Sequence, residues 1–224
     1  MTVLLVALSL VLVSARTGSA YEYAGQAWCC DSVHYYINPT NPTHACGAQP
    51  PLPNWFQVLV QNAAATWNAQ GTQFQLVYMD TTNVGCQPYA NNPNICAGIK
   101  DGQNTVSMAT NCNWIDNNVL AFATWWYWLP GNGDSSCCIF EADICFNDNV
   151  TWFDDMGTCS GSCYDLQSVA THEFGHWIAS NHEPDDAVLG YRPVMFPSFN
   201  FCEMRRNLTP DDIALLNWAY DPLG

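Results

Sequence analysis

The amino-acid sequence predicts one domain of the α/β or α+β class, with elements in the order strand, helix, several strands, helix, irregular stretch and helix. Short segments of alternating hydrophobic residues are interspersed with segments in which hydrophobic residues recur at helical spacing. No internal repeat or long linker divides residues 21–224. That length is sufficient for a single hydrophobic core.

The first part of the chain predicts a strand, a helix and a second strand. Every second residue is hydrophobic in residues 32–37, and an Asn-Pro pair follows. Residues 54–70 carry hydrophobic residues at helical spacing, and Gly71 provides a stop. Residues 73–79 alternate again and predict the second strand.

The middle of the chain predicts further strands over residues 105–109, 120–126 and 141–146. Two intervening segments, residues 80–104 and 129–138, are rich in Asn, Gly, Asp and Cys. These residue types favour turns, so both segments are predicted to be loops.

Two helices are predicted near the C-terminal end. The first covers residues 166–179, with Ser162 or Asp165 as alternative N-caps. The second begins with Thr209 as its N-cap and Pro210 at the first helical position, and two carboxylates follow in its first turn. The residues expected to form its buried stripe are Ile213, Leu216 and Tyr220.

The N-terminal residues and the cysteines predict an extracellular protein. Residues 1–20 read as a secretory signal, because the hydrophobic run from Val3 to Val13 is too short to span a bilayer. Small residues place the cleavage after Ala20, with Ala15 as the alternative. All 12 cysteines follow this point, so up to six disulfides are expected, with their connectivity left open.

The composition argues against two classes of partner. The chain has 20 acidic residues against 5 Lys and Arg, for a formal net charge of −15. Without a basic patch, neither nucleic acid nor an anionic membrane is an expected partner. Because 49% of the residues are hydrophobic, the charge does not indicate disorder, and a folded monomer is expected.

The segment THEFGHWIASNHE, residues 171–183, predicts a zinc site. His172 and His176 are four residues apart, about 40° around a helix axis, so both imidazoles can bind one zinc ion. His182 is the expected third ligand if the helix stops near Ala179 and the chain turns back. Glu173 is placed to act as general base on a water that attacks a carbonyl group. The alternative is a helix whose histidines have no role in metal binding.

These residues resemble the HExxHxxGxxH motif of metzincin zinc endopeptidases. Met195 lies thirteen residues after His182 in PVMFP, which is similar to the Met-turn that supports the metal in that clan. The final segment LTPDDIALLNWAYDP and the strand EADICF are most similar to the matrixins, the matrix-metalloproteinase group. The resemblance implies a twisted, mostly parallel mixed sheet with two helices above the substrate cleft. An irregular C-terminal subdomain ending in one helix would lie below it.

The chain departs from the family motif at one position. Ala179 stands where the motif has the glycine that releases the chain from the helix. A left-handed Ala costs roughly 1–2 kcal/mol. Asn181 tolerates a left-handed conformation better and is the alternative location of the turn. Of the three histidines, His182 is the one whose binding to the metal depends on this turn.

The resemblance also implies how a substrate and other cofactors would bind. The strand containing Ala142-Asp143-Ile144 would pair with an extended protein or peptide substrate. The residues expected to line the pocket for the side chain after the cleaved bond are Tyr191, Phe196, Phe199 and Phe201. A structural calcium ion is a further expectation, with a solvated acidic loop as the alternative. Its candidate ligands are Asn132, Asp134, Asp148, Asp154 and Asp155.

The resemblance does not by itself predict how the protein would be kept inactive or whether it is an active peptidase. The family's PRCGxPD-like propeptide segment is not seen before the domain, so latency by some other means, or no latency, is expected. Cys46 is interpreted as a disulfide partner. Two other classes of function are a zinc-binding but inactive homologue used for adhesion or inhibition, and a metal-free cysteine-rich structural protein. The presence of Glu173 argues against the first, and the Met-turn and final helix argue against the second.

Overall fold

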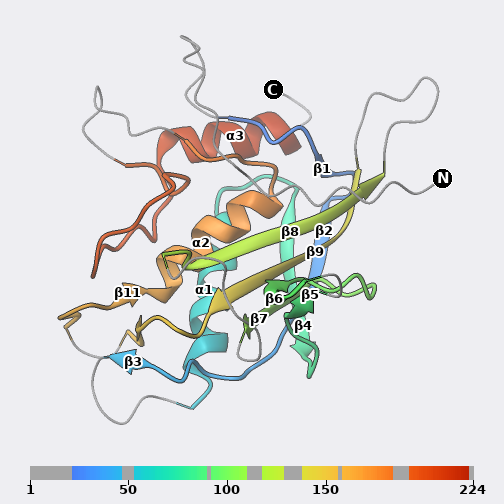
Figure 1. Ribbon diagram of the computed structural model, residues 1–224. Coiled ribbons are helices and arrows are strands. Elements are labelled where there is room, and N and C mark those ends of the chain that lie inside the picture. The colour runs from blue at the N-terminus through green and yellow to red at the C-terminus, as the bar shows by residue number, and fades with distance from the viewer. Residues whose placement is uncertain are drawn as a thin grey trace.

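The computed structural model describes residues 22–46, 53–89, 92–109, 118–128, 138–155, 158–183 and 192–221. The predicted signal segment lies outside this part of the chain, as does most of the predicted loop over residues 129–138. The helices and strands succeed one another in an α/β arrangement (Figure 1). They are β1 (Ala27–Trp28), β2 (Ser32–Ile37), β3 (Ala45–Cys46), α1 (Trp55–Asn68), β4 (Gln75–Thr81), β5 (Gln87–Tyr89), β6 (Asn92–Ala97), β7 (Thr105–Ala109), β8 (Ala121–Trp128), β9 (Cys138–Asn147), β10 (Trp152–Phe153), β11 (Tyr164–Asp165), α2 (Leu166–Trp177) and α3 (Pro210–Tyr220).

The main sheet is mixed and mostly parallel, as the resemblance implies. Its order is β1-β9-β7-β2-β4. β8 pairs with the edge of β9 that faces away from β7. Only the β8–β9 pair is antiparallel in this sheet. Among the described residues β8 pairs with β9 alone, so β8 is an edge strand.

One face of the sheet carries the hydrophobic core, which α1 and α2 complete. Tyr35 of β2, Trp67 of α1 and Trp177 of α2 are fully buried in the same cluster. The helices supply this layer because their hydrophobic residues recur at the spacing the sequence shows. The opposite face has a smaller cluster around the Cys86–Cys145 disulfide. The segment from 80 to 104 was predicted as a loop but contains the β5–β6 hairpin.

The strand with the Ala142-Asp143-Ile144 sequence is central, so the prediction that it forms the substrate-binding edge is wrong. β9 has β7 on one side and β8 on the other at Asp143 itself. Asp143 of this strand is buried and accepts the amides of Ile99 and Thr105 (2.7 and 2.9 Å). Glu141 likewise accepts the amide of Asp101 (2.6 Å). Backbone amides of a segment distant in sequence therefore supply the hydrogen bonds that the buried carboxylates of this strand require.

The helix ends follow local sequence signals. Of the two candidate N-caps of α2, Asp165 is the one used, and its carboxylate accepts the amide of Ser168 (3.0 Å). α3 begins with Thr209 as N-cap and Pro210 in the first turn, as predicted. The buried hydrophobic residues of α3 are Leu215 and Leu216, whereas Ile213 is only partly buried, so its predicted stripe was partly wrong.

The C-terminal helix closes the fold beside the first strand (Figure 1). The hydroxyl of Tyr220 in α3 accepts the amide of Trp28 in β1 (3.1 Å). The ring of Tyr220 stacks on Phe74, with 4.2 Å between ring centroids. These contacts hold α3 against the sheet and, as shown below, bring its first turn under the candidate site.

Disulfides join distant parts of the chain, as the cysteine count predicts. Among the described residues they are Cys29–Cys138, Cys46–Cys163, Cys86–Cys145 and Cys159–Cys202. The expected disulfide role of Cys46 is therefore confirmed. Each bond closes a loop of 43 residues or more, which restricts the unfolded chain. Within the described part of the chain, no helix is long and hydrophobic enough to cross a bilayer.

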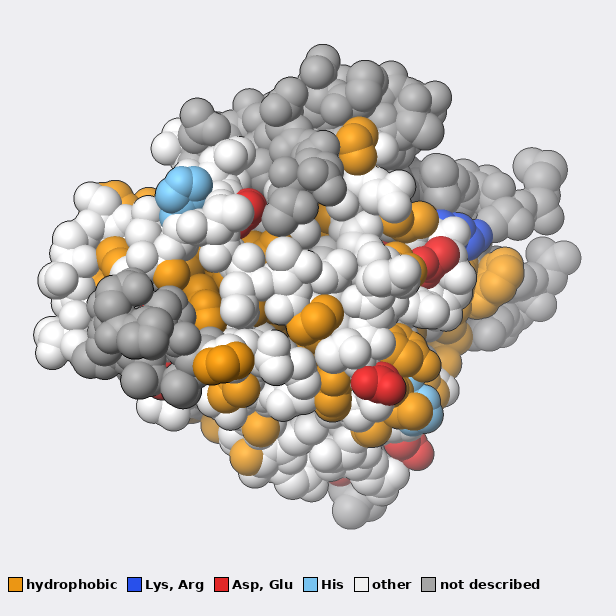
Figure 2. Space-filling model, turned by 90° about the horizontal axis from the view of Figure 1, so that it is seen from below, with side chains coloured by type: hydrophobic (Ala, Val, Ile, Leu, Met, Phe, Trp, Pro, Cys, Tyr) orange, Lys and Arg blue, Asp and Glu red, His pale blue; other side chains and the backbone are white. Residues whose placement is uncertain are grey.

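One face of the molecule carries few charged side chains in spite of the net charge. In the view from below Figure 1, few acidic or basic side chains are visible among the described residues, and hydrophobic side chains are scattered among uncharged polar ones (Figure 2). This agrees with a charged-residue content of only 11%. The acidic excess thus reflects a shortage of Lys and Arg more than an abundance of carboxylates.

Candidate metal centre

Helix α2 brings His172 and His176 together one turn apart. Both side chains are buried, and their ring centroids are 4.8 Å apart. The helix continues only to Trp177, so the chain is free to turn back soon after the second histidine. Two buried imidazoles at this spacing commonly provide two of the protein ligands of a metal ion.

The chain then returns His182 to the same point. Its ring centroid lies 5.2 Å from that of His172 and 4.9 Å from that of His176. One potential ligand atom from each of the three histidines lies within 4.8 Å of the others. The structure therefore groups the three histidines singled out in the sequence.

Hydrogen bonds orient the two helical histidines. The Nδ1 atom of His172 lies 2.8 Å from the carbonyl oxygen of Val194, and Nδ1 of His176 lies 2.8 Å from that of Ser180. A carbonyl oxygen only accepts, so each Nδ1 carries the proton and each Nε2 keeps a free lone pair. This is the arrangement by which backbone carbonyls commonly orient metal-binding histidines.

Burial keeps all three histidines neutral. It lowers the pKa of His172 well below its ordinary range, with His176 and His182 adding to the effect. Burial and the proximity of His182 lower the pKa of His176 to about 4. Burial also lowers the pKa of His182. A neutral imidazole is the form that binds a metal ion, so the electrostatics of the cluster suit a cation and disfavour protons.

The turn between the helix and His182 is made by Ala179 and not by Asn181. Ala179 has a φ of 98°, whereas Asn181 is absent from the described non-glycine residues with positive φ. Main-chain pairing with the N-terminal segment holds this turn. The amide of Ala24 donates to the carbonyl of Ala179 and that of Asn181 to the carbonyl of Glu22, each at 2.8 Å. Tertiary hydrogen bonds thus support a conformation that the local sequence disfavours.

Replacing Ala179 with glycine is expected to change the free energy of unfolding by less than about 0.5 kcal/mol. The loss of a buried methyl group and of backbone restriction would be offset by relief of roughly 1–2 kcal/mol of strain. The matched control is Ala170→Gly in α2, which is also fully buried and should cost about 2 kcal/mol. Urea denaturation measures both variants. Equal costs at the two positions would show that Ala179 is unstrained.

Glu173 is buried beside the three histidines, and only part of its hydrogen-bonding capacity is used. It is only 4% exposed, and its Oε2 atom has no hydrogen-bond partner within the described part of the chain. Burial raises the pKa of Glu173 to about 8, although a hydrogen bond from the backbone amide of Ala123 acts in the opposite direction. A carboxyl group with a pKa near neutrality is able both to accept and to donate a proton.

Met195 lies beneath α2, where the Met-turn comparison expects it. It is fully buried, and a Cβ atom added to Gly175 would lie only 2.2 Å from its Sδ atom. The glycine inside HEFGH therefore allows the thioether to pack directly against the helix backbone. The carbonyl of Met195 also accepts the amide of Glu183 (2.9 Å), which connects this turn to the residue after His182.

Asp212 is a residue of the site that the sequence argument assigned only to the helix cap. Its carboxylate accepts the amides of Val194 (3.1 Å) and Met195 (3.3 Å) in addition to the amide and hydroxyl of Thr209 (both 2.7 Å). One buried side chain therefore starts α3 and fixes the turn under the histidines. The capping pattern was visible in the sequence, but the second pair of donors lies seventeen residues or more away.

Glu183 is a second residue that the sequence argument missed. It is 1% exposed, and neither carboxylate oxygen has a hydrogen-bond partner among the described residues. Burial raises its pKa from the ordinary 4.5 to about 9, with contributions from Asp212, Asp211 and Glu22. The carboxyl group is therefore mostly protonated in the folded, metal-free chain at neutral pH.

We expect Glu183→Gln to stabilise the metal-free protein at high pH. Because the pKa is higher in the folded state, the stability this carboxyl contributes is present below pH 4.5 and is lost as pH rises toward 9. The variant should gain up to about 5 kcal/mol at pH 8, because ionisation is opposed over roughly 3.5 pH units, and less than about 0.5 kcal/mol at pH 4. Denaturation of chelator-treated protein at both pH values measures this, with the exposed Asp31→Asn as control. A gain that is the same at both pH values would contradict it.

Two of the candidate calcium ligands are engaged by other groups of the chain. Asp148 accepts the amide of Thr43 (2.7 Å), and Asp155 pairs with Arg206 (2.8 Å). Asn132 and Asp134 lie outside the described residues, so a calcium site remains a prediction. Sulfur atoms of Cys46, Cys159 and Cys163 also lie close together, but all three are in disulfides and cannot act as thiolate ligands.

The expected pocket residues separate in the structure. Phe199 is partly buried with its ring centroid 5.8 Å from that of His172, whereas Phe201 is 52% exposed and contacts Tyr164. Phe196 lies over the guanidinium of Arg192 (4.7 Å). Tyr191 is outside the described residues. Of the four, Phe199 is therefore the one that the structure places against a candidate metal ligand.

Comparison with known proteins gives partial similarities. No protein-family model matches the chain. Over 74 residues (32% of the chain) it is 36% identical to Metalloendoproteinase 1-MMP of Arabidopsis thaliana, covering 19% of that protein. Over 92 residues (41% of the chain) it is 30% identical to Matrix metalloproteinase-18 of Xenopus laevis, covering 16% of it. The matches span less than a fifth of each relative and indicate a matrixin-like relationship over part of the chain.

Proposed function

We propose that this chain is a secreted zinc-dependent endopeptidase of the matrixin type, which cleaves peptide bonds in protein substrates. The observation that carries the proposal is the convergence of His172, His176 and His182, with ligand atoms within 4.8 Å of one another. The carbonyl partners of the two helical histidines leave Nε2 free on each. Partial similarity to two metalloproteinases and the disulfide-rich fold also support it.

The three histidines would hold the metal ion. When bound, a zinc ion would supply Lewis-acid chemistry that activates water and polarises the scissile carbonyl. Glu173 would accept a proton from the attacking water and then deliver it to the leaving amine. Its burial suits this role, because a raised pKa makes the return of the proton favourable. Met195 would support the site from below without binding the metal.

The substrate would pair with β8 instead of with β9. β8 has a free edge among the described residues, and the amide of Ala123 on this strand donates to Glu173. Within the described part of the chain, this edge of β8 therefore lies beside the candidate base. An extended peptide that adds to this edge would bring its backbone carbonyl groups close to Glu173.

Zinc content and cleavage of a denatured protein substrate test the proposal. The wild type should contain one zinc ion per chain, and a chelator should abolish both zinc and cleavage until zinc is restored. His176→Ala should lose the metal and the activity, whereas His34→Ala, on the exposed face of β2, should retain both. Zinc without any cleavage would favour an adhesion or inhibitory module. The absence of zinc from the wild type would favour a structural cysteine-rich protein.

A further inference from the structure

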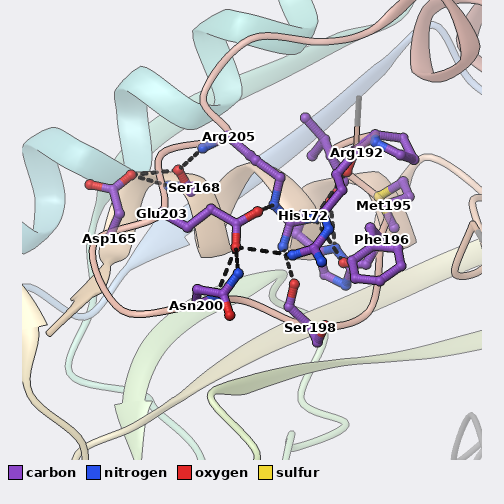
Figure 3. Close-up of polar contacts among 12 residues, drawn as sticks. Asp165, Ser168, His172, Arg192, Met195, Phe196, Ser198, Asn200, Glu203 and Arg205 are labelled. Atoms are coloured by element: carbon purple, nitrogen blue, oxygen red, sulfur yellow. Dashed lines mark hydrogen bonds and ion pairs between the residues drawn. The ribbon is translucent and has the colours of Figure 1, made fainter. Parts of the chain in front are cut away.

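A buried arginine lies under the segment that joins the candidate site to α3. The Arg205 side chain is 7% exposed and extends between Met195, Phe196 and Ser198 on one side and Glu203 on the other (Figure 3). A buried guanidinium is costly to desolvate unless its donors find acceptors. Its surroundings therefore identify what it stabilises.

The acceptors are main-chain carbonyls of one irregular segment. Nη1 of Arg205 donates to the carbonyls of Pro193 and Phe196, each at 2.9 Å, and Nη2 to that of Ser198 (2.5 Å). This segment contains the Met-turn and has no helix or strand that would satisfy its carbonyls. The planar, fixed array of donors on a guanidinium can bind several carbonyls at once, which the single ammonium group of lysine does less well.

One of these acceptors also orients a candidate metal ligand. The carbonyl of Val194 accepts Nδ1 of His172 at 2.8 Å and lies 3.4 Å from Nη1 of Arg205. The oxygen that sets the orientation of His172 is therefore held in place from the other side by the arginine. A shift of this carbonyl would rotate His172 and change the position of its Nε2.

The same guanidinium supports the ring next to His172. Cζ of Arg205 lies 3.6 Å from the ring centroid of Phe199, whose own centroid is 5.8 Å from that of His172. Cation–π contact of this kind fixes the position of a partly exposed ring. Arg205 therefore contacts both the carbonyl that orients His172 and the ring that lies beside it.

The arginine is itself anchored to the start of the metal-binding helix. Its backbone amide donates to Oγ of Ser168 (2.7 Å), and that hydroxyl donates to the N-cap carboxylate of Asp165 (2.5 Å). Its Nε atom pairs with Glu203 at 3.1 Å. Figure 3 shows this chain of contacts from Asp165 through Ser168 to Arg205. The contacts with Ser168 and Glu203 thus fix the position of Arg205 relative to α2, and its guanidinium contacts the segment around Met195 from that fixed position.

We propose that Arg205 is a positioning residue that couples the shape of residues 193–199 to the orientation of His172. The proposal rests on the proposed zinc peptidase function. The guanidinium of Arg205 donates its hydrogen bonds to main-chain carbonyls, and one of its faces is covered by Phe199. Arg205 therefore acts by positioning these groups and does not contact the substrate.

The test compares Arg205→Lys and Arg205→Met with Arg192→Lys. Arg192 pairs with the same Glu203 (3.6 Å) and the same Phe196, but its side chain is 37% exposed. Zinc affinity is measured with a competing chromophoric chelator, and the visible spectrum of the cobalt-substituted protein reports ligand geometry.

We expect Arg205→Lys to lose about tenfold in zinc affinity and Arg205→Met more, with an altered cobalt spectrum. Arg192→Lys should change the zinc affinity by no more than twofold and should leave the cobalt spectrum unchanged. Added guanidinium chloride should partly restore the zinc affinity of Arg205→Ala, whereas sodium chloride at equal ionic strength should not.

Three results would overturn the inference. If folded Arg205→Lys binds zinc with the wild-type affinity and gives the wild-type cobalt spectrum, the arginine has no positioning role. If Arg192→Lys gives the same losses, the effect is one of general charge. If the wild type binds zinc but cleaves no peptide, the affinity and spectral results still decide the coupling to His172. Absence of zinc from the wild type would overturn both this inference and the proposed function.

Discussion

Replacing Glu173 with glutamine is expected to lower kcat by about 10³-fold while zinc remains bound at one ion per chain. Glutamine keeps the shape of the side chain but cannot accept the proton of the attacking water, and general acid–base catalysis contributes roughly 10²–10⁴-fold. Because Glu173 is not one of the three grouped ligands, the metal content should not change. Steady-state kinetics on a peptide substrate and zinc analysis of the same sample measure both quantities.

The matched control is Glu22→Gln, the same chemical change at an exposed position. It should leave kcat within twofold of the wild type. The assignment of Glu173 as the base would be wrong if the zinc-loaded variant kept more than a tenth of the wild-type kcat. Loss of zinc together with activity would instead show that Glu173 helps to hold the metal.

Replacing Asp212 with alanine is expected to destabilise the protein by about 3–5 kcal/mol and to weaken zinc binding by at least tenfold. The change leaves the buried amides of Val194 and Met195 without their acceptor, and each such group costs roughly 1–3 kcal/mol. The carbonyl of Val194 orients His172, so displacement of this turn also affects the metal ligand. Denaturant unfolding and chelator competition measure the two effects.

Thr209→Ala separates the turn from the helix cap. Thr209 caps α3 together with Asp212 but donates nothing to the Met-turn. It should cost about 1 kcal/mol, the usual cost of losing an N-cap, with unchanged zinc affinity. If Thr209→Ala weakened zinc binding as much as Asp212→Ala did, the effect on the metal would come from the helix as a whole.

Most of the strands and helices that position the site could be predicted from local pattern. β2 and β7 have the predicted boundaries, and α1, α2 and α3 begin within one residue of the predicted starts. These elements carry strong periodicity or a capping residue, which act over a few residues. The β5–β6 hairpin was missed because its segment is rich in turn-forming residues and lacks a clear alternation.

The order of strands in the sheet was beyond local pattern. The resemblance placed the strand of Glu141 and Asp143 at the edge, whereas both carboxylates are buried and accept backbone amides of the segment 99–105. β8 lacks such charges but forms the edge. A polar side chain satisfied by a distant backbone amide has the same sequence pattern as one satisfied by water.

The sequence by itself determined the chemistry of the candidate site. His172, Glu173 and His176 lie within one helical turn or little more, so their relation follows from helix geometry alone. The structure decided the remaining parts: the positive φ of Ala179, the acceptor role of Asp212 at the Met-turn, and the contacts of Arg205 with carbonyls from Pro193 to Ser198. Each of these depends on hydrogen bonds between groups that only the folded chain brings together, and short-range periodicity carries no information about such pairs.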